Sequence, residues 1–155
     1  SAAVYHKIKN PFWDEKINAM RGRFGTKALD MKDVLRFMMK TPNDGETAYL
    51  FVADQSPKKS AIHYYINFLH QNTPVFNGFD KIAQRKNMGV VYCKTEKRKR
   101  GHYHTTFIRI KPQNEKFEEN EIVHQFFDLL EKNIQQHPSN WLWSHKRWKY
   151  ADLQK

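Results

Sequence analysis

The pattern that most constrains this fold is an amphipathic stripe within residues 119–137. Apolar side chains recur there at helical spacing, at Ile122, Val123, Phe126, Phe127, Leu130 and Ile134. Spacings of three and four residues place them on one face of an α-helix, and a globular protein buries such a face. Pro138 cannot continue the helix, so the helix is predicted to end there.

Helical and extended segments alternate along the earlier part of the chain. Asn10-Pro11 predicts a helix start, because Asn is a good cap and Pro is favoured at the first helical position. A second helix is predicted to begin after Asp30 as its cap and to stop at Thr41-Pro42, and a buried strand at residues 48–53 follows. A helix followed by a strand predicts the α/β class, with a mixed sheet flanked by helices.

The middle of the chain continues this alternation. We predict an extended stretch at 62–69, a short helix at 78–86 and an antiparallel hairpin formed by residues 88–94 and 102–110. The basic turn Lys97-Arg-Lys-Arg-Gly101 joins the two hairpin strands. Such a turn could grip phosphates, but a solvated hairpin tip requires the same composition. No repeat or low-complexity linker interrupts the chain, so residues 1–155 are expected to form a single domain.

Charge and cysteine content restrict the class of protein. The formal net charge is +11, which predicts an anionic partner such as nucleic acid, an acidic carrier protein or a phosphate-bearing membrane surface. Cys93 is the only cysteine, which excludes an internal disulfide and a zinc site built from several thiolates. We expect Cys93 to be a small buried hydrophobe. No apolar run approaches the length of a membrane span.

No complete active site can be recognised from the residues alone. The chain has neither a Gly-x-Ser-x-Gly elbow nor a phosphate-binding glycine loop. His102 and His104 would share one face of a strand, but no third ligand is evident, so no metal site is expected.

Two short elements are nevertheless placed for function. Asp54 and Gln55 follow the predicted strand at its carboxyl end, where α/β folds place their sites. Arg21 and Arg23 lie in a glycine-flanked turn after the first helix, where they could reach a phosphate or carboxylate. The alternatives are that Asp54 caps the following turn and that the arginines form a solvated helix end.

The segment 138–149 is unusually rich in aromatic and basic residues, with three tryptophans, one histidine and three basic side chains. If it is helical, Trp141, His145 and Trp148 share one face, and Trp143 and Arg147 share another. Rings beside long cationic side chains suit a boundary between an apolar and an anionic phase. The alternative is a C-terminal helix that caps the core.

Taken in order, these segments resemble the bacterial lipid A biosynthesis acyltransferase family. The matching pieces are Asn10-Pro-Phe-Trp-Asp14, Arg21-Gly-Arg-Phe-Gly25, Val52-Ala-Asp-Gln-Ser-Pro57, Phe68-Leu-His-Gln-Asn-Thr-Pro-Val-Phe-Asn-Gly78, Lys99-Arg-Gly-His-Tyr103 and Trp141-Leu-Trp-Ser-His-Lys-Arg-Trp-Lys149. The resemblance implies an acyltransferase with the glycerolipid acyltransferase-type fold and no bound cofactor. It also implies transfer of a fatty acyl chain from acyl carrier protein, or from acyl-CoA, to a hydroxyl of a lipid A precursor. The reaction would take place at the cytoplasmic face of the inner membrane, and nucleic acid is not expected as a partner.

Catalysis in the family relies on a His followed, after four intervening residues, by Asp or Glu. The His acts as general base on the acceptor hydroxyl and the acid orients it. No His of this chain has an acid at that position, since His124 is followed there by Leu129. The resemblance places the pair upstream of the Asn10-Pro11 helix. The chain is therefore expected to be a soluble fragment that lacks the pair and the membrane anchor and is inactive alone.

The residues that the resemblance carries over are supporting ones. Arg23, or Arg21 in a shifted register, would contact the acceptor's anionic head or the developing charge. Asp54 with Gln55 would shape the same pocket. The closing motif would serve interfacial anchoring or packing, through Trp141, Trp143, His145, Arg147 and Lys149. Two alternatives stay open, an acceptor that is a lysophospholipid or aminolipid, and a non-catalytic module that binds anionic membrane or nucleic acid.

Overall fold

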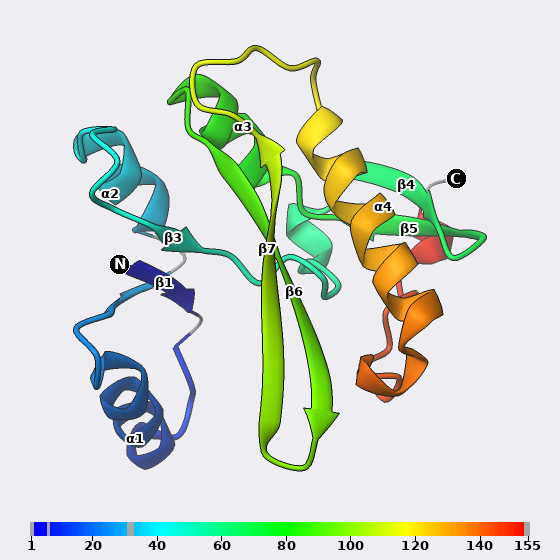
Figure 1. Ribbon diagram of the computed structural model, residues 1–155, viewed down its shortest axis with the longest axis horizontal. Coiled ribbons are helices and arrows are strands. Elements are labelled where there is room, and N and C mark those ends of the chain that lie inside the picture. The colour runs from blue at the N-terminus through cyan, green and yellow to red at the C-terminus, as the bar shows by residue number, and fades with distance from the viewer. Residues whose placement is uncertain (1, 6, 31–32, 154–155) are drawn as a thin grey trace. The chain divides into compact units, whose positions relative to one another are not determined.

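The structure is a computed structural model that describes residues 2–5, 7–30 and 33–153. The chain divides into two compact units, Ser1–Val52 and Ala53–Lys155. Both combine small sheets with helices (Figure 1), and the predicted mixed α/β class is confirmed. In place of one mixed sheet, the strands form three small sheets, of three, two and two strands.

The first unit is built on a parallel sheet with β1 (Ala2–Tyr5) in the centre. β2 (Lys27–Asp30) pairs along the whole of β1, and β3 (Tyr49–Leu50) pairs with only its first two residues. The chain passes through α1 (Pro11–Gly22) between β1 and β2, and through α2 (Val34–Lys40) between β2 and β3. Parallel neighbours require such crossover connections, because consecutive strands must run in the same direction.

The start of α1 follows its sequence signal. The side-chain oxygen of Asn10 accepts hydrogen bonds from the backbone N–H groups of Phe12 at 3.0 Å and Trp13 at 3.3 Å, as predicted for the cap. The end of the helix lies later than predicted, because Arg21 belongs to its last turn and only Arg23 is the C-cap. The two arginines therefore do not share one turn.

Two other predictions for the first unit are wrong. Asp30 ends β2 and does not cap a helix, because its backbone pairs in parallel register with β1, and α2 begins only at Val34. The buried strand predicted at 48–53 is reduced to Tyr49–Leu50, since only these residues pair with β1. Leu50 and Val52 are exposed, so Asp54 does not follow a buried strand.

The core of the second unit forms around α4 (Glu121–Gln136). Ile122, Val123, Phe127, Leu130 and Ile134 of the predicted stripe are buried. Phe68 of β4 (Tyr64–Phe68) packs edge-on against Phe127, with the ring centroids 5.2 Å apart. β4 pairs antiparallel with β5 (Gln71–Val75), a strand that the sequence did not indicate. Pro74 obscured it, since proline is disfavoured in strand interiors.

A short helix and a long hairpin complete the sides of this core. α3 (Gly78–Arg85) presents the buried Asp80, whose Oδ2 accepts a hydrogen bond from the backbone N–H of Val123 in the first turn of α4 at 3.1 Å. β6 (Val90–Lys99) and β7 (His102–Lys111) form the predicted antiparallel hairpin (Figure 1). The turn is shorter than predicted, because β6 extends to Lys99.

Cys93 is exposed on this hairpin, so its predicted burial is wrong. Strand alternation gives the reason. Tyr92 points into the core and is buried, so its neighbours Val91 and Cys93 must point away from the core. The apolar residues around Cys93 suggested that it is buried, but only the face that carries Tyr92 is covered.

The segment after α4 is not an α-helix, which overturns the faces predicted for residues 141–149. A short 3-10 turn (Pro138–Asn140) follows α4, and turns and a second 3-10 segment (Ala151–Leu153) complete the described chain. Side-chain hydrogen bonds to β5 and to Ser56 hold this tail instead. Among residues 2–5, 7–30 and 33–153, no helix is both long and apolar enough to cross a membrane.

Candidate functional site

The two predicted arginines lie on the surface of the first unit. Arg21 is exposed in the last turn of α1, and Arg23 is exposed where the helix ends. The Arg23 guanidinium lies over the ring of Phe24, 5.6 Å from its centroid. Gly25 then turns the chain with φ of +77°, in the left-handed region that glycine tolerates best. Both guanidinium groups are accessible to an anion in solution.

Asp54 lies in the second unit, next to the predicted tail. It is partly buried in an irregular bend, and Gln55 beside it is exposed. The Asp54 charge acts on Arg147, one of the tail residues, and on the hydroxyl of Tyr92 in β6. The structure therefore brings Asp54 together with the tail, a pairing that the spacing of 93 positions between Asp54 and Arg147 gave no reason to expect.

Arg147 is the central residue of this cluster. Its side chain is buried, with 1% of its surface exposed. One guanidinium nitrogen donates to the carbonyl of Pro74 at 2.8 Å, and the group lies over the ring of Phe127 at 5.6 Å from its centroid. Its Nε and Nη2 have no hydrogen-bond partner among the described residues. This cation is therefore stabilised by one carbonyl, one ring and the charge of Asp54.

Burial has measurable consequences for the acid–base chemistry here. Desolvation lowers the pKa of Arg147 from its ordinary value to about 10, and the negative charge of Asp54 opposes this change. Burial also raises the pKa of the Tyr92 hydroxyl above 10.0; a hydrogen bond from Asn133 opposes the shift and the charge of Asp54 adds to it. Arg147 stays cationic at neutral pH, so a positive charge faces Asp54 permanently.

Ser56 links the Asp54 segment to the tail. Its backbone N–H donates to Nε2 of His145 at 3.1 Å, and its hydroxyl donates to the backbone carbonyl of Arg147. The first of these bonds requires that Nε2 of His145 carries no proton, because Nε2 accepts. Ser56 carries no local sequence signal of this role, since its partners lie about 90 positions away.

The other tail residues are divided between packing and exposure. The ring of Trp141 lies 6.3 Å from that of Phe68, and the indole N–H of Trp148 donates to Oγ1 of Thr73 at 2.8 Å. Trp143 is exposed, and its indole N–H donates to the carbonyl of Pro138 at 2.8 Å. Lys149 is exposed over the ring of Tyr150. His145 and Arg147 are thus packed inward, whereas Trp143 and Lys149 face solvent.

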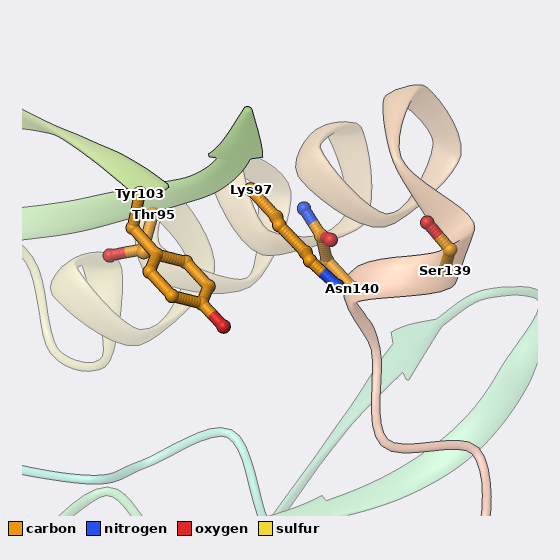
Figure 2. Close-up of a pocket in the computed structure, with 5 residues that line it drawn as sticks. All are labelled: Thr95, Lys97, Tyr103, Ser139 and Asn140. Carbon is orange, nitrogen blue, oxygen red and sulfur yellow. The ribbon is translucent and has the colours of Figure 1, made fainter. Parts of the chain in front are cut away.

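A hollow of about 340 Å³ lies between the hairpin and the end of α4. Three of its lining residues, Thr95, Lys97 and Tyr103, come from the hairpin, and Ser139 and Asn140 come from the 3-10 turn after α4. Figure 2 shows the Lys97 side chain reaching across toward Asn140. The five lining residues supply one cation, three hydroxyls and an amide, and no carboxylate. This chemistry favours an anionic group.

Metal ligands are not clustered in the part of the chain that the structure describes. Within the described ranges, no group of three or more His, Cys, Asp and Glu side chains could hold a metal ion. His124, on the exposed side of α4, is instead 2.9 Å from the Tyr64 hydroxyl.

Comparison with known proteins finds a matching family. The model of a family described as bacterial lipid A biosynthesis acyltransferase matches residues 1–150, which is nearly the whole chain. The match includes Arg21, Arg23, Asp54 and the tail through Lys149. No curated protein matches the chain.

Proposed function

The chain belongs to the bacterial lipid A biosynthesis acyltransferase family and is of the acyltransferase class, and we propose that its reaction moves a fatty acyl chain from acyl carrier protein to a hydroxyl of a lipid A precursor. The observation that carries this proposal is the family match over residues 1–150. The formal charge of +11 supports it, because the carrier protein, the phosphorylated acceptor and the inner-membrane surface are all anionic. The proposed location is the cytoplasmic face of that membrane.

We assign acceptor binding in the first unit to Arg23, with Arg21 beside it. Both guanidinium groups are exposed, and neither belongs to an ion pair within the described part of the chain. Arginine presents a planar fork of donors that matches phosphate oxygens in pairs. In this proposal Arg23 holds a phosphate of the acceptor or stabilises the negative charge that develops on the reacting carbonyl oxygen.

We assign a supporting role in the second unit to Asp54. The Ser56 hydrogen bonds join the bend that carries Asp54 to the tail, and the charge of Arg147 acts on the Asp54 carboxylate. A carboxylate held in this way can accept hydrogen bonds from an acceptor sugar without rearrangement. Gln55, which is exposed beside it, would supply a second polar contact.

The general base is the remaining requirement of acyl transfer to a hydroxyl. No His of the 155 residues is followed by an acid at the fifth position after it. We propose that a His and acid pair outside these residues supplies the base, and that the 155-residue chain alone does not catalyse transfer. A rate for this chain equal to that of the full-length protein would contradict this.

Acyl transfer by the full-length protein tests the acceptor assignment. Acyl chains on acyl carrier protein serve as donor, and a tetra-acylated lipid A precursor is compared with a lysophospholipid. We expect incorporation into the lipid A precursor. Incorporation into the lysophospholipid alone would replace the proposed acceptor.

The same assay tests the two assigned residues. Arg23→Ala and Asp54→Ala are each expected to lower kcat/KM more than tenfold, which corresponds to about 1.4 kcal/mol of transition-state stabilisation. Arg36→Ala and Asp128→Ala are matched controls, because both side chains are exposed on other helices. Unchanged rates in Arg23→Ala or Asp54→Ala would remove that residue from the site.

A further inference from the structure

One face of the β6–β7 hairpin is exposed along its whole length. Strand alternation sends every second residue to this outer face, which consists of Val91, Cys93, Thr95, Lys97, Tyr103, Thr105, Phe107 and Arg109. Phe107 is 71% exposed, Tyr103 65% and Val91 50%. Phe107 lies directly opposite Cys93, and Tyr103 directly opposite Lys97. The outer face thus carries an apolar middle beside a cationic end.

The charge of the hairpin has one sign on this face. Residues 90–111 contain seven Lys and Arg side chains and one acid, Glu96, a formal charge of +6. Glu96 points to the opposite face, where it lies 2.7 Å from Nε2 of His137 and 3.5 Å from Nζ of Lys94. The outer face therefore presents Lys97 and Arg109 with no carboxylate between them.

This combination fits a lipid surface better than a polynucleotide. Burying an exposed Phe or Val side chain is worth about 1.5–3 kcal/mol, and a polynucleotide offers stacking only to rings, not to Val91. Each Lys or Arg near an anionic bilayer contributes about 1 kcal/mol. A bilayer interface satisfies both kinds of side chain together, since apolar groups enter the acyl boundary while cations stay among the phosphates.

The hollow at the cationic end adds a place for one headgroup. Lys97 and Tyr103 belong both to the outer face and to the hollow of about 340 Å³ that Ser139 and Asn140 close from the other side (Figure 2). An ammonium, hydroxyls and an amide are donors suited to phosphate oxygens. We infer that the outer face of the β6–β7 hairpin docks on an anionic lipid bilayer and that this hollow receives a lipid phosphate. The inference rests on the proposed function, because docking on a bilayer would bring the enzyme to its membrane-bound acceptor.

Vesicle binding tests this without measuring catalysis. The 155-residue chain is sedimented with vesicles of phosphatidylcholine alone and of phosphatidylcholine mixed with phosphatidylglycerol. We expect binding to the mixed vesicles only, weakened by added salt because the cationic contribution is screened. Binding to neither vesicle, or equally to both, would overturn the inference. The acyl-transfer assay is separate, so a failure of this inference is distinguishable from a failure of the proposed function.

Variants locate the surface. Phe107→Ser is expected to weaken vesicle binding about tenfold, and Lys97→Gln and Arg109→Gln about fivefold each. Leu142→Ser and Lys132→Gln are matched controls, since both side chains are exposed elsewhere in the same unit. All are surface positions, and circular dichroism checks that each variant is folded.

Two results would contradict the assignment to the hairpin. If Leu142→Ser weakens binding and Phe107→Ser does not, the tail contacts the lipid and the hairpin does not. If the hairpin variants lose binding to acyl carrier protein while vesicle binding is unchanged, the face is a docking surface for an acidic protein.

Discussion

At the scale of single residues, Arg147 is a buried cation whose lost hydration must be compensated by the residues around it. A buried cation costs several kcal/mol of hydration, which its partners must offset. Here the partners are the Pro74 carbonyl at 2.8 Å, the ring of Phe127 and the charge of Asp54. Because these come from separate segments, Arg147 ties the tail, β5, α4 and the Asp54 bend together.

Removing the Arg147 side chain should therefore destabilise the fold. Arg147→Ala is expected to lower the free energy of unfolding by about 3 kcal/mol, because it leaves a cavity and an unpaired carbonyl. Lys146→Ala, at the exposed neighbouring position, should change it by less than about 0.5 kcal/mol. Urea unfolding of the purified proteins measures both values. Equal stability of Arg147→Ala and the parent would show that the buried cation contributes nothing net.

A double-mutant cycle isolates the contribution of Asp54. If its charge stabilises Arg147, then Asp54→Asn and Arg147→Ala should be non-additive, with a coupling energy of about 1 kcal/mol. Additive effects would mean that Asp54 and Arg147 are neighbours without energetic linkage.

The sequence predicted a role for Arg147 only as part of the closing motif. Nothing in its basic, tryptophan-rich surroundings distinguished a buried arginine from a solvated one.

At the scale of elements, Glu96 links the β6–β7 hairpin to the end of α4 through an ionic contact with His137. The carboxylate lies 2.7 Å from the His137 imidazole, the residue that caps α4, and 3.5 Å from Lys94 of its own strand. Partial burial raises the pKa of Glu96, but the charges of Lys94 and Arg98 and the hydrogen bond with His137 outweigh it, so the pKa lies below its ordinary 4.5. The stability that this contact contributes therefore depends on pH.

Acid should weaken this contact between Glu96 and His137. A carboxylate with a lowered folded pKa contributes stability that is complete above its unfolded pKa of 4.5 and is lost as pH falls through the folded value. The parent should therefore be more stable than Glu96→Gln at about pH 6, and the difference should shrink as pH falls below the ordinary pKa of 4.5. Urea unfolding at a series of pH values measures this. Glu119→Gln, whose partner Lys81 is exposed at 3.7 Å, should show no such difference.

The elements that were predictable are those with local signals. The α4 stripe, the Asn10 cap and the β-favouring composition of the hairpin strands each depend on residues a few positions apart, and each prediction is confirmed. The two-residue β3, the position of Asp30 at the end of β2 and the strand β5 depend on which strand lies beside them. Propensity cannot supply that pairing, because β structure is set by neighbours distant in sequence. The contact of the Asp54 bend with the tail was not predictable for the same reason.

At the scale of the whole molecule, the two units bury very different amounts of apolar surface. Among the described residues of the first unit, the buried apolar side chains are those of Ala2, Val34 and Met38. The second unit buries the α4 stripe, Phe68, Val75, Phe79 and others. Phe12 and Trp13 of α1 remain exposed. Hydrophobic stabilisation is therefore concentrated in residues 53–155.

Native-state hydrogen exchange should report this difference. Amides of α1 and β2 are expected to exchange through local opening with a lower free energy than amides in the middle of α4, because few buried contacts hold them. Exchange followed by mass spectrometry of the intact chain gives both values. Equal protection of α1 and α4 would contradict a stability concentrated in the second unit.

The contacts of Arg147 also determine when the second unit can complete its folding during synthesis. On the ribosome a chain emerges from its N-terminus, and a unit can complete its core only when all of its core residues have emerged. The bonds from Ser56 to His145 and Arg147 join residues about 90 positions apart, and contacts so distant in sequence form late and slowly. Until translation has passed Arg147, the Asp54 bend has no partner and the apolar side of α4 is incompletely covered. The second unit therefore completes its core late in synthesis, although it buries more apolar surface than the first.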